Sequence, residues 1–291
     1  PLPVLHLFIT PANLSQADNN DSARTLCSIY YLGEFYDNIG INRHGQSSQG
    51  FPKKSYDLDF NSDHQFRWNL KEPRVGDINL LTTYPDKAHM RNMLSYETYR
   101  DAGSPYHFVS PVRVQTNGGF YGTWHMVENG DEDFLKRVGR DRDGALYKMY
   151  NSFASSGDTV IGINGTYAEK KTRKHEGNAD LVALFNGVNG IGTNKNLYLY
   201  DNLNISEAVN SIAARIVTGD VDCCHKNYYF YRDSDGTGEW EAFPWDVDLS
   251  FGRNWSSSQS YWDDAVYPQN PLYIGNNNSF FNALFTTPAT K

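Results

Sequence analysis

Acidic and amide side chains gather around one expected β-hairpin in the C-terminal half of the chain. Asp222 and Asn227 are separated by four residues at its start, and its return strand ends in Asp246-Val247-Asp248. Carboxylate and amide oxygens are ligands of the kind that Mg²⁺ prefers. In phosphoryl transfer an Asp accepts the proton of the attacking hydroxyl, while an Asn and a second Asp hold the metal. The spacing indicates a phosphoryl-transfer centre.

A structural interpretation of the same residues stays open. An Asp followed by an Asn near a turn often arises by chance, so this pair alone does not identify an enzyme. Asp246 and Asp248 are more informative because they follow the apolar strand end "AFPW". Carboxylates buried there would need a partner or a metal, since an isolated buried charge is costly.

The stretch "RHGQSSQGFPKKSYDLDF", residues 43–60, offers groups that suit a phosphate site. A polar, Gly-containing loop supplies backbone N–H groups, hydroxyls and a cation for phosphate oxygens. The candidate residues of the loop and of the strand after it are Arg43, Ser47, Ser48, Lys53 and Lys54. Strand alternation places Lys54 on the face of Tyr56 and favours it as the phosphate-binding lysine. The alternative is a surface turn with solvated charges.

Short strands and a few helices must position these groups. Period-two alternation and turn residues predict strands or hairpins at residues 4–9, 27–45, 53–60, 110–128 and 227–248. Helical periodicity and capping residues predict helices at residues 86–103, 129–139, 179–188 and 205–217. Residues 140–178 are polar and Gly-rich, which predicts little regular structure. The order of elements suits an α+β protein of two lobes.

The expected helix at 86–103 carries one further candidate. Met90, Leu94 and Glu97 fall on one helical stripe, so a carboxylate is expected among apolar positions. Glu97 is therefore a candidate partner for the phosphate-binding lysine.

Composition excludes several other classes of protein. With 291 residues the chain can hold one large domain or two lobes, and its net charge of −8 disfavours nucleic acid as a partner. No apolar run approaches the roughly 20 residues of a membrane span. The three cysteines, Cys27, Cys223 and Cys224, form neither a disulfide framework nor a zinc pattern. Neighbouring cysteines are hard to bridge, so a packing role is predicted for the adjacent pair.

Five segments resemble, in sequence order, motifs of the CotH kinase family of spore-coat-type proteins. They are "RHGQSSQGFPKKSYDLDF", "DKAHMRNMLSYETYRDAG", "NGGFYGTWHMVENGDEDFLKR", "DCCHKNYYFYRD" and "AFPWDVDLSFG", and they lie within about residues 25–252. The resemblance implies an atypical protein-kinase-like, two-lobed fold. Its N-lobe would be strand-rich with one main helix, and its helical C-lobe would carry a catalytic β-hairpin.

The resemblance also implies roles for the acidic residues. Asp222 matches the catalytic-loop Asp, and Asn227 matches the neighbouring metal ligand. Asp246 or Asp248 matches the Mg²⁺-binding Asp, and Asp246 is favoured as the first acid after the apolar strand. The chain lacks a G-x-G-x-x-G loop, and Gly219-Asp220-Val221 stand where a typical kinase has H-R-D.

Nucleotide contacts follow from the same resemblance. The phosphate-side loop would contain Arg43, Ser47 and Ser48, and the family pattern stresses Lys53, the first of the two lysines. The segment "HMVEN", residues 125–129, looks like an inter-lobe hinge against which adenine would stack. Its candidate cofactor-binding residues are Met126 and Glu128.

Taken over the whole chain, the resemblance implies an ATP- and Mg²⁺-dependent kinase that phosphorylates Ser or Thr of a protein substrate, secreted or associated with the spore coat. Residues 1–128 would form an N-lobe-like nucleotide-binding region and residues 129–291 a C-lobe-like catalytic region, with its C-terminal end expected to be truncated. The rival interpretations are a pseudokinase or structural surface module that binds nucleotide without turnover, and a carbohydrate-associated binding module suggested by the Tyr and Trp content. The protein substrate and the oligomeric state do not follow from the sequence.

Overall fold

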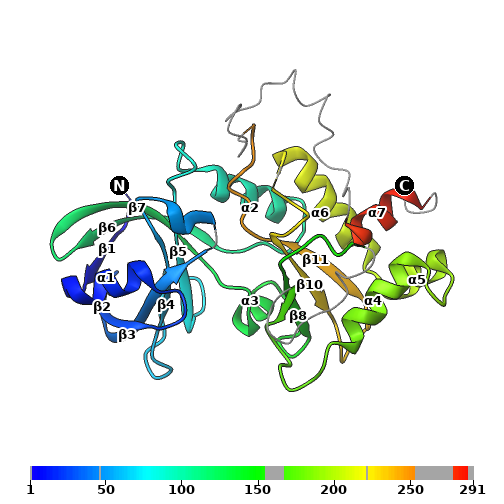
Figure 1. Ribbon diagram of the computed structural model, residues 1–291, viewed down its shortest axis with the longest axis horizontal. Coiled ribbons are helices and arrows are strands. Elements are labelled where there is room, and N and C mark those ends of the chain that lie inside the picture. The colour runs from blue at the N-terminus through cyan, green and yellow to red at the C-terminus, as the bar shows by residue number, and fades with distance from the viewer. Residues whose placement is uncertain (1, 46, 155–166, 221, 253–277, 288–291) are drawn as a thin grey trace. The chain divides into compact units, whose positions relative to one another are not determined.

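A closed β-barrel is the centre of the first of two units into which the chain divides (Figure 1). The first unit comprises Pro1–Met93 and Phe108–Asn129, and the second comprises Leu94–His107 and Gly130–Lys291. The computed structural model describes residues 2–45, 47–154, 167–220, 222–252 and 278–287. Each unit has its own cluster of buried hydrophobic side chains.

The barrel closes in the strand order β1-β2-β3-β4-β5-β7-β6. The strands are Val4–Phe8 (β1), Thr25–Tyr31 (β2), Glu34–His44 (β3), Ser55–Asp59 (β4), Asp77–Thr82 (β5), Val109–Thr116 (β6) and Gly119–Val127 (β7). Strands β1 and β6 run parallel, with Leu5 opposite Val114, and the other neighbours pair antiparallel. Because this parallel pair joins the two ends of the sheet, the barrel has no unpaired edge strand.

Alternation along the strands fills the barrel with side chains. In β2 every second residue from Thr25 to Tyr31 is buried, and in β4 Tyr56 and Leu58, on one face of the strand, are buried. Helix α1 (Pro11–Asn19), which the sequence did not indicate, packs against β2 and β3. It is capped by Thr10, whose hydroxyl accepts a hydrogen bond from the backbone N–H of Asn13.

Helix α2 (Arg91–Asp101) lies within the predicted helix but buries a different face. Met90 and Leu94 are exposed, so the predicted apolar stripe through Glu97 does not face a core. The buried residues lie instead on a neighbouring face of the helix, with the same helical spacing. They are Asn92, Ser95, Tyr96 and Tyr99. The apolar pattern failed here because the buried side chains carry polar atoms, of which the Ser95 and Tyr96 hydroxyls are hydrogen-bonded inside the fold. Asp86 precedes the helix and accepts hydrogen bonds from the backbone N–H groups of Met90 and Arg91.

A four-stranded sheet in the order β11-β10-β8-β9 is the centre of the second unit (Figure 1). Its strands are Ala145–Met149 (β8), Ala168–Lys170 (β9), Tyr228–Arg232 (β10) and Trp240–Pro244 (β11), and all neighbours pair antiparallel. The described helices that follow α2 are Glu132–Arg137 (α3), Ala179–Asn189 (α4), Lys195–Asn202 (α5), Ile205–Thr218 (α6) and Ser279–Thr286 (α7).

Both faces of this sheet are covered, which explains why the run "YYFYR" of β10 is almost wholly buried. On one face Tyr228 and Phe230 join a core with residues of α4, α6 and α7. On the other face Tyr229 lies against the rings of His107 and Trp245. Two buried faces give a continuous apolar and aromatic strand in place of simple alternation.

The predicted atypical protein-kinase-like, two-lobed fold with a helical C-lobe is wrong. The structure has a closed seven-stranded mixed barrel, and its second unit is centred on a sheet with few helices. Closure depends on pairing Leu5 with Val114, which are far apart in the chain, and no local pattern reveals such a contact. Strand β8 was also missed, because it lies in the segment 140–178 that was predicted to be irregular.

None of the helices within the described residues is long and apolar enough to cross a membrane.

Candidate active site

Asp222 and Asn227 meet at the start of the β10–β11 hairpin in the second unit. The Asn227 side-chain amide donates a hydrogen bond of 2.6 Å to Oδ2 of Asp222. The backbone of Asn227 is left-handed, with a φ of 63°, and its carbonyl accepts from the N–H of Trp245 at 3.1 Å. Asn is among the residues that tolerate this conformation best. The turn therefore directs both side chains to one place beside the end of β11.

Asp246 lies immediately beyond Trp245 and is also left-handed, with a φ of 54°. Its backbone N–H donates to the hydroxyl of Tyr96, a fully buried residue of α2, at 3.2 Å. Ser95 of the same helix donates to the carbonyl of Val247 at 3.3 Å. Non-glycine residues in sparsely populated backbone conformations concentrate at functional sites. Helix α2 thus holds the Asp246 turn in place, and Asp248, two residues on, is partly buried.

Asp222, Asn227 and Asp246 form the acidic cluster of the second unit, and its electrostatics favour the binding of positive charge. The pKa of Asp222 is raised to about 7, chiefly by burial and next by the negative charge of Asp246, although Lys226 acts in the opposite direction. A carboxylate whose pKa lies near 7 is suited to exchange a proton with substrate. A cation placed near these acids would relieve their mutual repulsion.

Asp220 and Arg215 support the cluster, and the sequence interpretation assigned neither of them a role. Asp220 is buried, its Oδ1 accepts from the backbone N–H of Asp222 at 3.2 Å, and its Oδ2 lies 3.9 Å from Nε of the fully buried Arg215. Burial raises the pKa of Asp220 to about 6, although the Arg215 charge opposes that rise. The spacing of Arg215 and Asp220 across the end of α6 was the available signal.

Cys223 and Cys224 are joined by a disulfide, so the prediction that they are unbridged and serve only in packing is wrong. Cys224 is buried in the core of the second unit, and its carbonyl accepts from the side-chain amide of Asn278, the N-cap of α7, at 2.9 Å. Cys27 is a free, buried cysteine of the barrel. The disulfide falls inside the loop that joins Asp222 to Asn227.

The predicted phosphate-side loop of the first unit closes on itself. Gly45 has a φ of +96°, and a Cβ there would lie 2.2 Å from the hydroxyl of Ser48, so only glycine fits without rearrangement. Ser47 begins a short 3₁₀ turn, Ser47–Gly50. Arg43 donates to the carbonyl of Asp18 at 3.3 Å. The loop conformation is held by contacts among its own residues and to the neighbouring α1.

The two candidate lysines have different surroundings. Both Lys53 and Lys54 precede β4, so strand alternation does not apply to them. Lys54 Nζ donates to the carbonyls of Gln49 and Phe51, each at 2.7 Å, and so caps the loop. Lys53 Nζ donates to the hydroxyl of Thr83 at 3.2 Å and to the carbonyl of Thr123.

Lys53 also belongs to a group of basic side chains that the sequence interpretation missed. Its Nζ lies 4.1 Å from the ring of Trp124, and its pKa falls to about 8 because of burial and the charge of Lys87. The pKa of His89 is also lowered, chiefly by burial and next by the charge of Lys53, with a smaller contribution from Lys87. The fragment "DKAH", residues 86–89, was the signal. Lys53, Lys87 and His89 form the basic cluster of the first unit.

The remaining predicted nucleotide contacts lie in structural positions. Met126 is fully buried in the barrel core. Glu128 is buried too, and its carboxylate accepts from the backbone N–H of Phe108 at 3.0 Å. Glu97 is partly exposed on α2 in the second unit, and its pairing with a lysine of the first unit stays a prediction.

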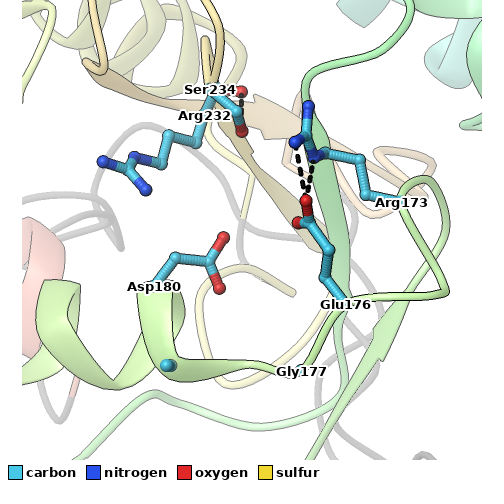
Figure 2. A pocket seen from close by; sticks show the side chains of 7 residues that line it. Arg173, Glu176, Gly177, Asp180, Arg232 and Ser234 are labelled. Atoms are coloured by element: carbon cyan, nitrogen blue, oxygen red, sulfur yellow. Dashed lines mark hydrogen bonds and ion pairs between the residues drawn. The ribbon is translucent and has the colours of Figure 1, made fainter.

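A pocket of about 270 Å³ lies at the start of α4, away from every predicted site residue. Figure 2 shows its charged lining, in which Arg173 pairs with Glu176. Arg173 also pairs with Asp235, and Asp180 accepts a hydrogen bond from Tyr147. Because these charges are matched by one another, we assign the pocket no ligand. Nor do the described residues contain a group of three or more His, Cys, Asp or Glu side chains suited to hold a metal.

Comparisons with known proteins agree with the motif order. Residues 41–291 match the family model described as "CotH kinase protein". The chain is also similar to the inner spore coat protein H of Bacillus subtilis (strain 168), with 24% identity over 262 residues that cover 87% of this chain and 70% of that protein. The matched region includes the phosphate-side loop, the basic cluster and the acidic cluster.

Proposed function

Because the chain belongs to the CotH kinase family, we propose that it transfers the γ-phosphoryl group of ATP to Ser or Thr hydroxyls of a protein substrate. The observation that carries the proposal is the pair made by Asp222 and Asn227 at 2.6 Å, next to the charge of Asp246. A base, an amide and a second carboxylate are the groups that phosphoryl transfer requires.

Asp222 would accept the proton of the attacking hydroxyl. Its Oδ2 is held by Asn227, which fixes the orientation of the carboxylate. Its pKa of about 7 keeps the base neither fully protonated nor very weak near neutral pH. Oδ1 of Asp220 accepts the 3.2 Å hydrogen bond from the backbone N–H of Asp222 and so holds the backbone at the proposed base. The contribution of these residues is positioning together with electrostatics.

Asn227 and Asp246 would hold the Mg²⁺ ion, with Asp248 as the alternative carboxylate. Mg²⁺ is commonly held by one or two carboxylates together with substrate phosphates, so a closed protein cage is not needed. The negative charge of Asp246 contributes to the raised pKa of Asp222. A cation bound near these two carboxylates would offset that repulsion. When bound, the ion would neutralise negative charge on the phosphate oxygens.

In the first unit, Lys53 is the better-placed phosphate ligand of the two lysines. Lys54 already donates to two carbonyls of the loop, whereas Lys53 lies with Lys87 and His89 in the basic cluster. A lysine whose pKa is lowered by a neighbouring cation gains from a phosphate nearby. We therefore propose Lys53 for the nucleotide phosphates and a structural role for Lys54.

We further propose that the protein acts at the spore coat or in another extracytoplasmic place. The relative's name places that protein in the inner spore coat. The Cys223–Cys224 disulfide is compatible, because disulfides persist mainly in oxidising compartments. A coat protein rich in accessible Ser or Thr would be the corresponding substrate.

Two substitutions test the proposed chemistry. Asp222→Ala and Asp246→Ala should each lower ³²P transfer from ATP to a protein acceptor by on the order of 100-fold to 10,000-fold, because they remove the base and a metal ligand. Asp201→Ala, which changes an exposed acid of α5, is the matched control and should keep full transfer. Transfer at the wild-type rate by both active-site variants would refute the proposal.

The pseudokinase alternative predicts a different result. A chain that binds nucleotide without turnover would show a rise in melting temperature with ATP and Mg²⁺ but no ³²P transfer. Under the kinase proposal the wild-type chain shows both. Asp246→Ala should remove the Mg²⁺-dependent part of the temperature rise.

A further inference from the structure

The two residues that follow Asp222 are joined in a disulfide, Cys223–Cys224. The bond lies inside the loop that carries the proposed base and ends at Asn227. We propose that this disulfide is a redox-modification site, reducible by a dithiol, whose oxidised form holds Asp222 in its active position. The effect on the loop stands by itself, whereas the effect on turnover rests on the proposed function.

The disulfide contributes little to the stability of the whole protein. A disulfide stabilises a fold mainly by closing a long loop in the unfolded chain. Here the cysteines are sequence neighbours, so the bond restrains no intervening residue. Its influence is confined to the segment from Asp222 to Asn227.

A continuous chain of contacts connects the disulfide to the base. Sγ of Cys224 lies 3.3 Å from Nη1 of Arg215, which donates to it. Nε of Arg215 lies 3.9 Å from Oδ2 of Asp220, and Oδ1 of Asp220 accepts from the backbone N–H of Asp222 at 3.2 Å. A change at the sulfur therefore has a short route to Asp222, through Arg215 and Asp220.

The position of each sulfur suits attack from one side. Cys223 is partly exposed, whereas Cys224 is buried. A thiolate of the dithiol attacks Sγ of Cys223, the S–S bond breaks, and Cys224 leaves with the electron pair and takes up a proton. The guanidinium of Arg215 beside Cys224 stabilises the negative charge of this leaving sulfur.

The second thiolate of the dithiol then completes the reaction. It attacks the mixed disulfide, releases Cys223 as a thiolate that takes up a proton, and leaves the reductant as its own disulfide. Two electrons pass from the dithiol to the protein. The two cysteines become independent thiols, and the covalent restraint on the loop between Asp222 and Asn227 is lost.

Hydrogen exchange of the full chain tests the structural part. Denatured, unreduced protein should show one thiol, that of Cys27, and three after treatment with dithiothreitol. Reduction should speed backbone exchange in residues 222–227 about tenfold, because the loop opens locally. Exchange in the barrel strands β2 and β3 should not change.

Kinetics test the positioning part. Reduction should lower kcat about tenfold or more at unchanged KM for ATP, since displacement of a catalytic group by about 1 Å can cost on the order of 100-fold. Reoxidation with oxidised glutathione should restore kcat. The double variant Cys223→Ser with Cys224→Ser should have the low kcat with or without reductant. Cys27→Ala, which removes the remaining cysteine, should keep the full response to dithiothreitol.

The outcomes separate the two proposals. Three thiols in unreduced protein, or equal exchange at residues 222–227 in both redox states, overturns the redox site. Faster exchange with unchanged kcat overturns the positioning role. Faster exchange on reduction with no phosphoryl transfer in either state supports the redox site and contradicts the proposed function alone.

Discussion

Two regions were predicted as ligand sites: the phosphate-side loop of the first unit, and the region of Asp222, Asn227 and Asp246 in the second unit, called the acidic loop below. They differ in how their charges are satisfied. In the first, Lys54 and Arg43 donate to backbone carbonyls of the loop and of α1. In the second, the negative charge of Asp246 adds to burial in raising the pKa of Asp222. A charge already hydrogen-bonded within its own loop stabilises that loop. Like charges that repel each other are stabilised when a ligand of opposite charge binds between them.

The same comparison separates residues inside one loop. Lys53 and Lys54 are adjacent, yet only Lys53 lies in the basic cluster with Lys87 and His89. Repulsion among cations marks a place for phosphate, as repulsion among acids marks a place for metal. The three predictions below test this difference, in order of decreasing expected effect.

The largest effect is expected on stability in the acidic loop. Asp220→Ala removes one partner of the buried Arg215 and should lower the free energy of unfolding by about 3–5 kcal/mol, because the buried guanidinium loses a nearby carboxylate. Urea denaturation measures the change. Asp201→Ala, on the exposed side of α5, should shift it by less than about 0.5 kcal/mol. A change in Asp220→Ala as small as that of the control would show that the acidic loop is no more tightly coupled than the surface.

A smaller effect should distinguish the two lysines. Lys53→Met should lower kcat/KM for ATP roughly 100-fold, since it removes a cation from the phosphate site. Lys54→Met should leave kcat/KM nearly unchanged and lower the free energy of unfolding by about 1–2 kcal/mol, because two loop carbonyls lose their donor. Steady-state kinetics and urea denaturation of both variants check the pair. The reverse pattern would assign the phosphates to Lys54.

The smallest effect concerns a buried acid outside both sites. Burial, and then the charge of Glu241, raises the pKa of Glu207 from 4.5 to about 8, while Ser104 and Arg140 act in the opposite direction. The folded state therefore binds the proton more tightly than the unfolded state, so this stability is complete below about pH 4.5 and is lost as pH rises toward about 8.

Glu207→Gln, which keeps an oxygen for Ser104, should remove that loss. Between about pH 5 and pH 6.5 the wild-type chain should lose roughly 2 kcal/mol more stability than the variant, at about 1.4 kcal/mol per pH unit within the window set by the pKa shift. Phosphoryl transfer at neutral pH should not change. A fall in phosphoryl transfer with Glu207→Gln would contradict this expectation. It would show that a carboxyl with a raised pKa contributes to function outside the acidic loop as well.

The parts of the fold that follow from short-range rules were predicted well. Asn117-Gly118 indicated the β6–β7 turn, and both residues have positive φ, 50° and 86°. The hairpins at β2–β3 and β10–β11 and helix α6 were predicted for similar reasons. Strand β8 was missed, although it lies at the centre of its sheet, because its neighbours in the sequence are polar and Gly-rich.

The candidate site divides in the same way. Asp222, Asn227 and Asp246 were predicted as site residues, and the structure brings the first two into contact. Arg215, Asp220 and the Cys223–Cys224 disulfide were not recognised as a support for Asp222. Their importance depends on burial and on contacts between α6 and the loop, which spacing along the chain does not express.

The sequence by itself determined the turns, the longer helix α6 and the set of acids and lysines from which a phosphoryl-transfer site could be built. Only the tertiary structure decided that the first strands close into a barrel, that Lys54 caps its own loop, and that Asp222 rests on a buried ion pair. The reason is physical. Local backbone preferences act between near neighbours, whereas closure, burial and pKa depend on residues brought together from distant parts of the chain.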